Sequence, residues 1–177
     1  MNASRDGLPW RRWLGRVTLG GGYPIPSRQR SALELEGYLS PRWLLGVEGG
    51  PYVGEQLVIA AFALTSLRYD SSSFGGPTLR EDVNAFGLSV PFVVPLRVDA
   101  IALLTPRLGI GFGSQSFGSK HEYSTGPAWG FDACVLMQRA HFGFGVGFWS
   151  LRAPARGAAE SNDYGSLLAL LNFGVGR

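Results

Sequence analysis

The sequence has little of what several common classes of protein need. It contains one cysteine, so an internal disulfide is impossible, and no closely spaced pair of cysteines is present to hold zinc. Only 16% of its residues are charged while 45% are hydrophobic, which excludes a disordered chain. Its 26 glycines follow no three-residue period, and no run of about 18 apolar residues occurs. Collagen-like chains and membrane-spanning helices are therefore excluded.

Lysine is also nearly absent. Lys120 is the only lysine, and arginine supplies the other basic residues behind the formal net charge of +3. The arginines are scattered singly, apart from the pair Arg11 and Arg12, whereas nucleic-acid binders usually cluster their basic residues. We therefore expect no nucleic-acid partner.

The length of 177 residues suits a single domain. We expect residues 1–10 to form a flexible amino-terminal segment and residues 11–177 to form one β-barrel domain, for the reasons given below. Residues Met1 to Pro9 lack the basic and apolar regions of a secretory signal, so the chain as written carries no signal sequence.

Apolar residues recur at every second position in many segments, which predicts strands with two unlike faces. The clearest segments are Phe86 to Leu96 and His141 to Trp149, and in the second one glycine occupies positions 143, 145 and 147 of the opposite face. The other apolar stripes are Trp13, Val17, Leu19 and Tyr23; Leu33, Leu35 and Leu39; Trp43, Leu45 and Val47; Leu104, Leu108, Ile110 and Phe112; Trp129, Phe131, Val135 and Met137; and Leu167, Leu171, Phe173 and Val175.

The face opposite the apolar stripes indicates which way the strands are turned. A soluble barrel would carry a densely polar exterior, but here the second face holds mainly glycine, serine and alanine with isolated charges of both signs. Such residues fit the crowded interior of a narrow barrel, where buried charges have to pair. We therefore predict that the stripes face lipid and that an interior charge network consists of Arg16, Glu34, Glu36, Glu48, Arg107 and Asp132.

A sheet in lipid has to close, because an open edge would leave backbone donors and acceptors unsatisfied. The predicted fold class is all-β, a closed antiparallel up-and-down transmembrane β-barrel. Short turns at 40–42, 97–99 and 139–141 alternate with longer connections at 24–29, 70–82, 115–127 and 154–163, which predicts eight strands with both termini at one end. The apolar stretch Gln56 to Tyr69 fits this count only as an extension of the third strand or a short helix, and ten strands are the alternative.

Aromatic residues near the ends of the stripes are typical of interfacial girdles. Trp13 and Trp43 are predicted to lie near one set of turns, and Tyr23, Trp129 and Trp149 near the other.

The runs RWLLGVEGG (42–50), PRLGIGFG (106–113) and HFGFGVGFW (141–149) place glycines and large apolar residues beside short turns. In this pattern the chain resembles the small outer-membrane β-barrel family of Gram-negative bacteria, which includes barrels of the outer-membrane protein A, X and W types. The resemblance covers about residues 11–176 and implies a place in the outer membrane. The partners it implies are the lipid bilayer, lipopolysaccharide and an extracellular ligand at the long loops.

Some barrels of that family are enzymes that modify lipid A, so candidate catalytic residues were considered. His121, Glu122 and Ser124 are close in sequence, but Tyr123 occupies the position where the family's deacylases have serine, and a polar cluster of this kind is usually solvated surface. Glu34 and Glu36 share one face and could act as an acid and base pair, although an ion-pair network is favoured. His141 is predicted to lie in a turn, and Cys134 to fill interior space.

No group of His, Asp or Glu has metal-ligand spacing. We expect no enzymatic activity, no cofactor and no metal. The predicted function is an integral outer-membrane β-barrel with a narrow or plugged polar interior and a structural, surface-interaction or small-solute role. Glycines 143, 145 and 147 would leave interior volume for a narrow channel. The alternative is a soluble lipocalin-like barrel whose stripes point inward around an apolar ligand.

Overall fold

The computed structural model describes residues 13–24, 41–70, 79–97, 99–117, 119–137, 140–154, 161–163 and 165–176. Its regular elements are strands, and among these residues there is no helix long and apolar enough to cross a membrane. The long strands are β1 (Trp13–Pro24), β2 (Arg42–Pro51), β3 (Ala60–Asp70), β4 (Leu79–Ser89), β6 (Ala100–Phe117), β7 (Lys120–Met137), β8 (Phe142–Pro154) and β10 (Ser166–Gly176), and the short ones are β5 (Phe92–Arg97) and β9 (Ser161–Asp163).

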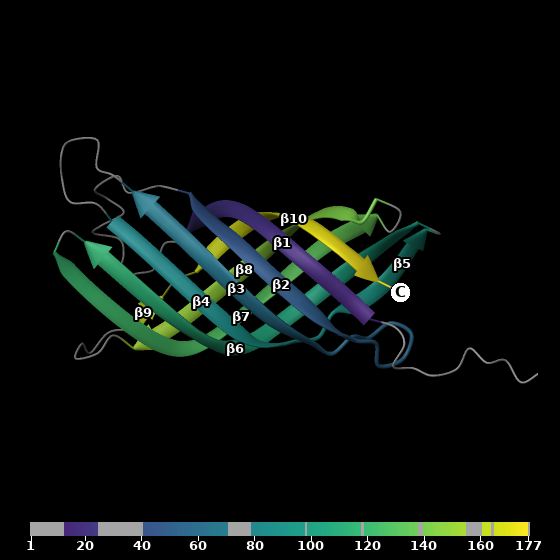
Figure 1. The fold of residues 1–177 in the computed structure, drawn as a ribbon, viewed down its shortest axis with the longest axis horizontal. Coiled ribbons are helices and arrows are strands. Elements are labelled where there is room, and N and C mark those ends of the chain that lie inside the picture. Colours follow the sequence, from purple (N-terminus) through teal and green to yellow (C-terminus); the bar gives the residue numbers. More distant parts are fainter. Residues whose placement is uncertain are drawn as a thin grey trace, which may run out of the picture.

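The eight long strands form one closed antiparallel barrel (Figure 1). Each strand pairs with its neighbours in chain order, and the ring closes because β10 pairs with both β1 and β8. Closure leaves no open edge along the wall, which is the condition for a sheet in lipid. The predicted fold class and the count of eight strands are confirmed.

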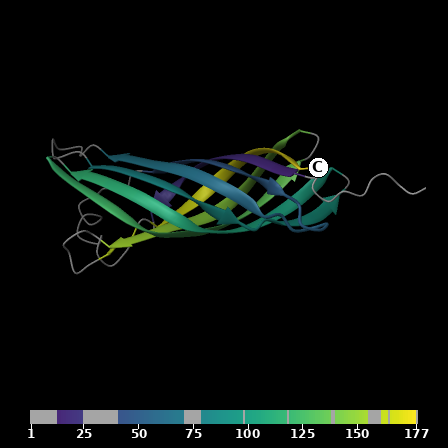
Figure 2. The ribbon, with the colours of Figure 1, turned by 60° about the horizontal axis from the view of Figure 1, so that its bottom comes forward.

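Strand β1 begins and strand β10 ends at the same end of the barrel, on the right of Figure 1, which is called the terminal end below. The opposite end is called the loop end. Figure 2 shows how the strands wind obliquely around the long barrel, with β6 and β7 extending far toward the loop end. Each of these two strands has 18 residues.

The fourth barrel strand is interrupted without ending at a site flanked by two prolines, Pro91 in the strand itself and Pro106 in the neighbouring β6. Ser89, which ends β4, and Phe92, which begins β5, lie opposite β6 residues that are also three positions apart, so the register does not change. Pro91 and Pro106 fall within this interval and have no N–H group to donate. The Val90 N–H donates to the Pro106 carbonyl at 3.1 Å. Strand β5 therefore continues β4 toward the terminal end.

The stretch Gln56 to Tyr69 contains a full barrel strand, β3, which pairs with both β2 and β4. Its interpretation as an extension of the previous strand or a short helix is wrong. The tight turn before it includes Gly54 at φ 88°, a left-handed conformation that glycine adopts without steric cost. Phe62 and Leu64 are buried on the inward face of β3. Since both faces of this segment are apolar there, the sequence shows no clear alternation.

The predicted connections are correct in part. The connections predicted at 97–99 and 139–141 agree with the strand bounds, because β5 ends at Arg97 and β6 begins at Ala100, while β7 ends at Met137 and β8 begins at Phe142. The turn at 40–42 is wrong, because Arg42 begins β2 at the loop end. The loop at 115–127 is also wrong, because β6 and β7 stay paired up to Phe117 and Lys120. Polar residues on this far part of the hairpin resemble a loop in sequence. The predicted strand at 33–39, the segment 1–10 and most of the other long connections lie outside the described residues.

The apolar stripes point outward. Leu108 is 68% exposed, Val146 62% and Phe86 53%, each in a stripe predicted to face lipid. A lipocalin-like barrel would bury these side chains around its ligand. The arrangement therefore disfavours the soluble alternative.

The aromatic residues are placed differently from the prediction. Trp13 begins β1 at the terminal end, while Trp43 lies opposite Gly21 near the loop end, together with Tyr23. These two tryptophans therefore belong to opposite ends of the barrel. Trp149 is only 3% exposed and points into the barrel, so its assignment to a girdle is wrong. It follows Phe148 by one position, and neighbouring residues of a strand point to opposite faces.

Candidate functional site inside the barrel

The barrel interior is filled by alternating apolar and charged layers. Strand β2 passes through all of them, because Arg42, Leu44, Glu48 and Tyr52 all point inward and are buried. Leu44 belongs to an apolar cluster that includes Phe62 and the residues around it on neighbouring strands. Tyr52 belongs to a second apolar cluster nearer the terminal end. Each apolar layer has a charged residue of this chain segment next to it in the direction of the loop end. Arg42 lies beside the layer of Leu44, and Glu48 lies beside the layer of Tyr52.

The charged layer between the two apolar clusters is called the central cluster and consists of Arg16, Glu48, Arg107 and Asp132. Arg16 Nη1 donates to Asp132 Oδ2 at 2.7 Å, and its Nη2 donates to Glu48 Oε1 at 3.0 Å. Arg107 Nε and Nη2 donate to Glu48 Oε2 at 2.9 and 2.7 Å. Arg107 Nη1 also contacts Asp132 Oδ1. Each arginine thus bridges both carboxylates.

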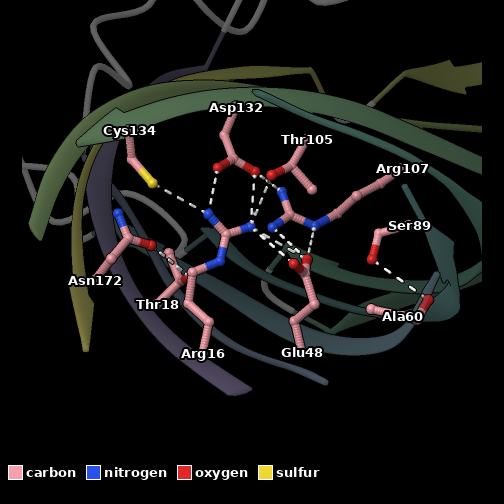
Figure 3. Close-up of polar contacts among 10 residues, drawn as sticks. All are labelled: Arg16, Thr18, Glu48, Ala60, Ser89, Thr105, Arg107, Asp132, Cys134 and Asn172. Carbon is pink, nitrogen blue, oxygen red and sulfur yellow. Dashed lines mark hydrogen bonds and ion pairs between the residues drawn. The ribbon is translucent and has the colours of Figure 1, made fainter. Parts of the chain in front are cut away.

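These four residues reach toward one another across the lumen (Figure 3). The strand order around the ring places β1 opposite β6 and β2 opposite β7. Arg16 on β1 and Arg107 on β6 therefore come from opposite walls, as do Glu48 on β2 and Asp132 on β7. Arg16 donates to Thr105 on the opposite strand β6, and the bonds from Arg16 to Asp132 and from Arg107 to Glu48 join strands three apart in the ring, so side chains cross the lumen at this level.

The electrostatics of the central cluster are balanced. Two guanidinium groups face two carboxylates, and their side chains are 0% to 13% exposed. Burying a charge is costly unless it is paired and hydrogen-bonded. Arg16 meets that condition with two further contacts, to Thr105 Oγ1 at 3.2 Å and to Cys134 Sγ at 3.3 Å. The guanidinium of Arg107 lies 5.9 Å from the centre of the Phe62 ring, an attractive cation–π contact.

The free space beside the central cluster is small. A cavity of about 30 Å³ is lined by Glu48, Phe62, Asp132 and Trp149 among others. This is about the volume of one water molecule in the liquid.

The inward glycines of β8 pack closely against their neighbours. A Cβ at Gly145 would lie 2.2 Å from the Ala133 carbonyl oxygen, and one at Gly147 would lie 2.8 Å from Leu170 Cδ1. A side chain at either position would therefore collide with β7 or with Leu170.

A second charged cluster lies nearer the loop end and was missed in the sequence. Glu81 is its centre, accepting from Arg42 Nη2 at 2.5 Å and from Gln115 Nε2 at 3.2 Å, with Arg68 Nη1 at 3.7 Å. The sequence pattern predicts a turn at Arg42 and a loop at Glu81, and it leaves the type of the segment with Arg68 open. The phase of β2 could have revealed Arg42, since it shares the inward face with Glu48.

The other candidate residues are not brought together. Glu34 and Glu36 lie outside the described residues. His121 is exposed on β7, whereas Ser124 is buried and donates to the Gly113 carbonyl at 3.5 Å, so the two lie on opposite faces of the strand. Cys134 is buried inside the barrel. The part of the chain that the structure describes contains no group of three His, Cys, Asp or Glu side chains able to hold a metal ion.

Comparison with known proteins identifies solved structures with the same architecture. No protein-family model and no curated protein sequence matches the chain. Among solved structures, Neisserial surface protein A matches with a TM-score of 0.60 at 13% identity, over 91% of this chain and 96% of that one. This chain has the fold of the small outer-membrane β-barrels. Ail, the attachment invasion locus protein of Yersinia pestis, matches with a TM-score of 0.53 at 8% identity, over 92% of this chain and 98% of that one. Ail in complex with the heparin analogue sucrose octasulfate matches with a TM-score of 0.51 at 9% identity and the same coverage.

Proposed function

We propose that this protein is an integral outer-membrane β-barrel whose interior is closed by the central cluster and whose role is structural or in surface interaction, without catalysis. The observation that carries the proposal is the hydrogen bonding of Arg16 and Arg107 to Glu48 and Asp132 from opposite walls. A lumen crossed in this way blocks free diffusion, and the space beside it is about 30 Å³. The barrel therefore serves as a membrane-embedded base for its loop end.

The outer wall supports the membrane location. Its outward positions are apolar or small over about ten residues per strand, as from Trp13 to Tyr23 on β1, which is the length that a tilted strand needs to cross the hydrocarbon. Exposed aromatic residues stand at both limits, with Trp13 at the terminal end and Trp43 and Tyr69 toward the loop end. Polar outward groups, such as the paired Arg80 and Asp82, lie at the loop-side limit of this band, opposite Tyr69 and Leu67 in the pairing of β4 with β3.

The loop end is the side that we propose faces the exterior of the cell, in contact with lipopolysaccharide and available to an extracellular ligand. The described strands β6 and β7 extend toward this end, as an exposed platform requires (Figure 2). Ail, which has the same fold, was crystallised with a heparin analogue. That complex supports surface interaction as a use of this architecture.

The proposal is tested in two steps. First, the chain is refolded in detergent and compared by gel mobility with and without boiling, together with its strand content by circular dichroism. A compact form that boiling unfolds, insoluble without detergent, is expected of a membrane barrel. A monomer that stays soluble in plain buffer would contradict the membrane location.

Second, the refolded barrel is inserted into planar bilayers and its conductance is recorded. We expect no steady conductance from the wild type, because the central cluster closes the lumen. A steady single-channel current would instead favour passage of small solutes. The double variant Glu48→Ala/Asp132→Ala is the matched comparison, since it removes both acceptors that hold the two arginines across the lumen.

A further inference from the structure

The outer wall has a large hollow on its lipid-facing side. It is an open groove of about 820 Å³ whose lining is almost entirely apolar. Large exposed side chains form its rim, among them Trp43, Leu67 and Phe144. Gly21 and Ala169 form its centre, and they lie opposite each other in the pairing of β1 with β10.

Small residues between large ones produce this shape. Gly21 has no side chain, so the ring of Trp43 on β2 lies over that position, 3.2 Å from where a Cβ would be. Ala169 on β10 has a small side chain and lies between the exposed Leu167 and Leu171, so the surface of the wall is also lower at this position. The result is a depression in a surface that elsewhere carries leucine, phenylalanine and valine.

The position of the groove fixes the leaflet that it contacts. Gly21 lies three residues before the end of β1 and Trp43 is the second residue of β2, both at the loop end. Aromatic residues at this level are typical of the boundary between hydrocarbon and headgroups. The groove therefore lies in the acyl-chain region of the leaflet on the loop side, immediately below its headgroups.

We propose that this groove binds an acyl chain of lipopolysaccharide. The inference rests on the proposed function, because a barrel with its loops outside the cell contacts lipopolysaccharide in that leaflet. The groove is continuous with the wall that contacts lipid, and its lining has the chemistry of hydrocarbon. Since lipid tails are as apolar as the wall, burial alone gives no preference, and selectivity has to come from close packing against a fitting shape. An acyl chain is narrow and flexible enough to follow a groove.

A second copy of this chain fits the groove less well. A symmetric dimer centred here would place the same concave surface on both sides of the interface. Two facing hollows leave empty space, and atoms that line such a gap lose their van der Waals contacts. The shape thus favours a chain-like occupant.

The test measures lipid that stays bound after gentle extraction. The refolded barrel is placed in nanodiscs containing phosphatidylethanolamine and a short, defined lipopolysaccharide, extracted with mild detergent and weighed by native mass spectrometry. We expect one lipopolysaccharide on the wild-type barrel. Ala169→Leu fills the groove and should weaken the affinity about fivefold, measured as occupancy over a series of lipopolysaccharide fractions, which corresponds to a change of ~1 kcal/mol in binding free energy.

The matched control is Ala61→Leu, which adds the same atoms to an exposed outward position of β3 away from the groove. It should leave occupancy unchanged. Trp43→Ala, which removes part of the rim, is a second variant and should lower occupancy as well. Heat-modifiable gel mobility of each variant verifies that the barrel has folded.

Three results would overturn the inference. They are equal occupancy in Ala169→Leu and Ala61→Leu, retention of phosphatidylethanolamine in place of lipopolysaccharide, and a dimer that Ala169→Leu dissociates. A wild-type barrel that inserts into nanodiscs but retains no lipopolysaccharide would overturn only this inference. A wild-type barrel that fails to insert would overturn the proposed function as well.

Discussion

The inward and outward faces of the barrel wall differ in how they accommodate polar side chains, although residues of the two faces alternate along the same strands. The inward face holds Arg16, Glu48 and Asp132 almost completely buried, each with hydrogen-bonding partners from other strands. The outward face of the described strands is apolar or small over the apolar band, and its charged pair of Arg80 and Asp82 lies at the loop-side limit, opposite Tyr69 and Leu67. Inside the barrel a charge finds its partner in another strand, whereas in lipid it finds none.

This difference shows what restricts the choice of residues at each face. Outward positions tolerate any apolar or small residue, because lipid adapts to the surface. Inward positions depend on specific partners, because Arg16 is held by groups on β2, β6 and β7 at once. Substitutions should therefore act through lost partners inside and through exposure to hydrocarbon outside. The following predictions test that distinction in order of decreasing effect.

The largest effect is expected from Asp132→Ala inside the barrel. It leaves two buried arginines facing one carboxylate, and removing one partner of a buried ion pair costs about 3 to 5 kcal/mol. The free energy of unfolding in urea, followed by gel mobility in detergent, should fall by that amount. A fall below ~1 kcal/mol would mean that water reaches the central cluster, so that its ion pairs contribute as little as exposed pairs do.

Outside the barrel, Leu108→Arg places a charge on a side chain that is 68% exposed on the lipid-facing wall. In lipid vesicles this should lower the free energy of unfolding by about 2 to 4 kcal/mol, the cost of arginine near the bilayer centre. Ser116→Arg is the control, because Ser116 is an outward residue of the same strand near the β6–β7 turn, paired with the exposed His121. Equal effects at the two positions would contradict the boundary of the apolar band.

Arg107→Leu should have a smaller effect than Asp132→Ala. Arg107 is the most exposed member of the central cluster, at 13%, so its loss leaves carboxylates that water reaches more easily. We expect the free energy of unfolding to fall by about 2 kcal/mol in detergent. An unchanged unfolding midpoint would show that Glu48 and Asp132 need only Arg16, and that the bridging by Arg107 adds no stability.

The smallest effect is expected from Asp82→Ala. Its ion pair with Arg80 has a distance of 2.8 Å, similar to those inside, but the two side chains are 30% and 60% exposed. Exposed pairs contribute about 0 to 1 kcal/mol, so the unfolding midpoint should move little. A loss as large as that of Asp132→Ala would remove the contrast between the two faces.

Much of the wall was predictable from sequence. Alternation identified which residues face lipid in β1, β2, β6 and β10, and glycine at every second position marked the inward face of β8. Alternation of apolar and polar residues does not identify β3, because Phe62 and Leu64 make its inward face apolar too. It also failed in the far part of the β6–β7 hairpin, where polar residues on both faces give no alternation.

The interior was predictable only in part, because periodicity assigns a face but no partner. The phase of each strand placed Arg16, Glu48, Arg107 and Asp132 inside the barrel. It could not tell that they meet at one level, since that depends on the register of strands far apart in the sequence. The cluster around Glu81 was missed because its residues had been assigned to a turn, a loop and a segment of uncertain type.

The sequence by itself determined that this chain forms a sheet with one apolar face, and that this face meets lipid, because side-chain direction follows from position along a strand. The tertiary structure alone decided which charges pair and at which level of the barrel they meet. Those outcomes depend on the closure of the ring and on the stagger between strands. Closure places β1 opposite β6 and β2 opposite β7, and the stagger brings their charged residues to the same height.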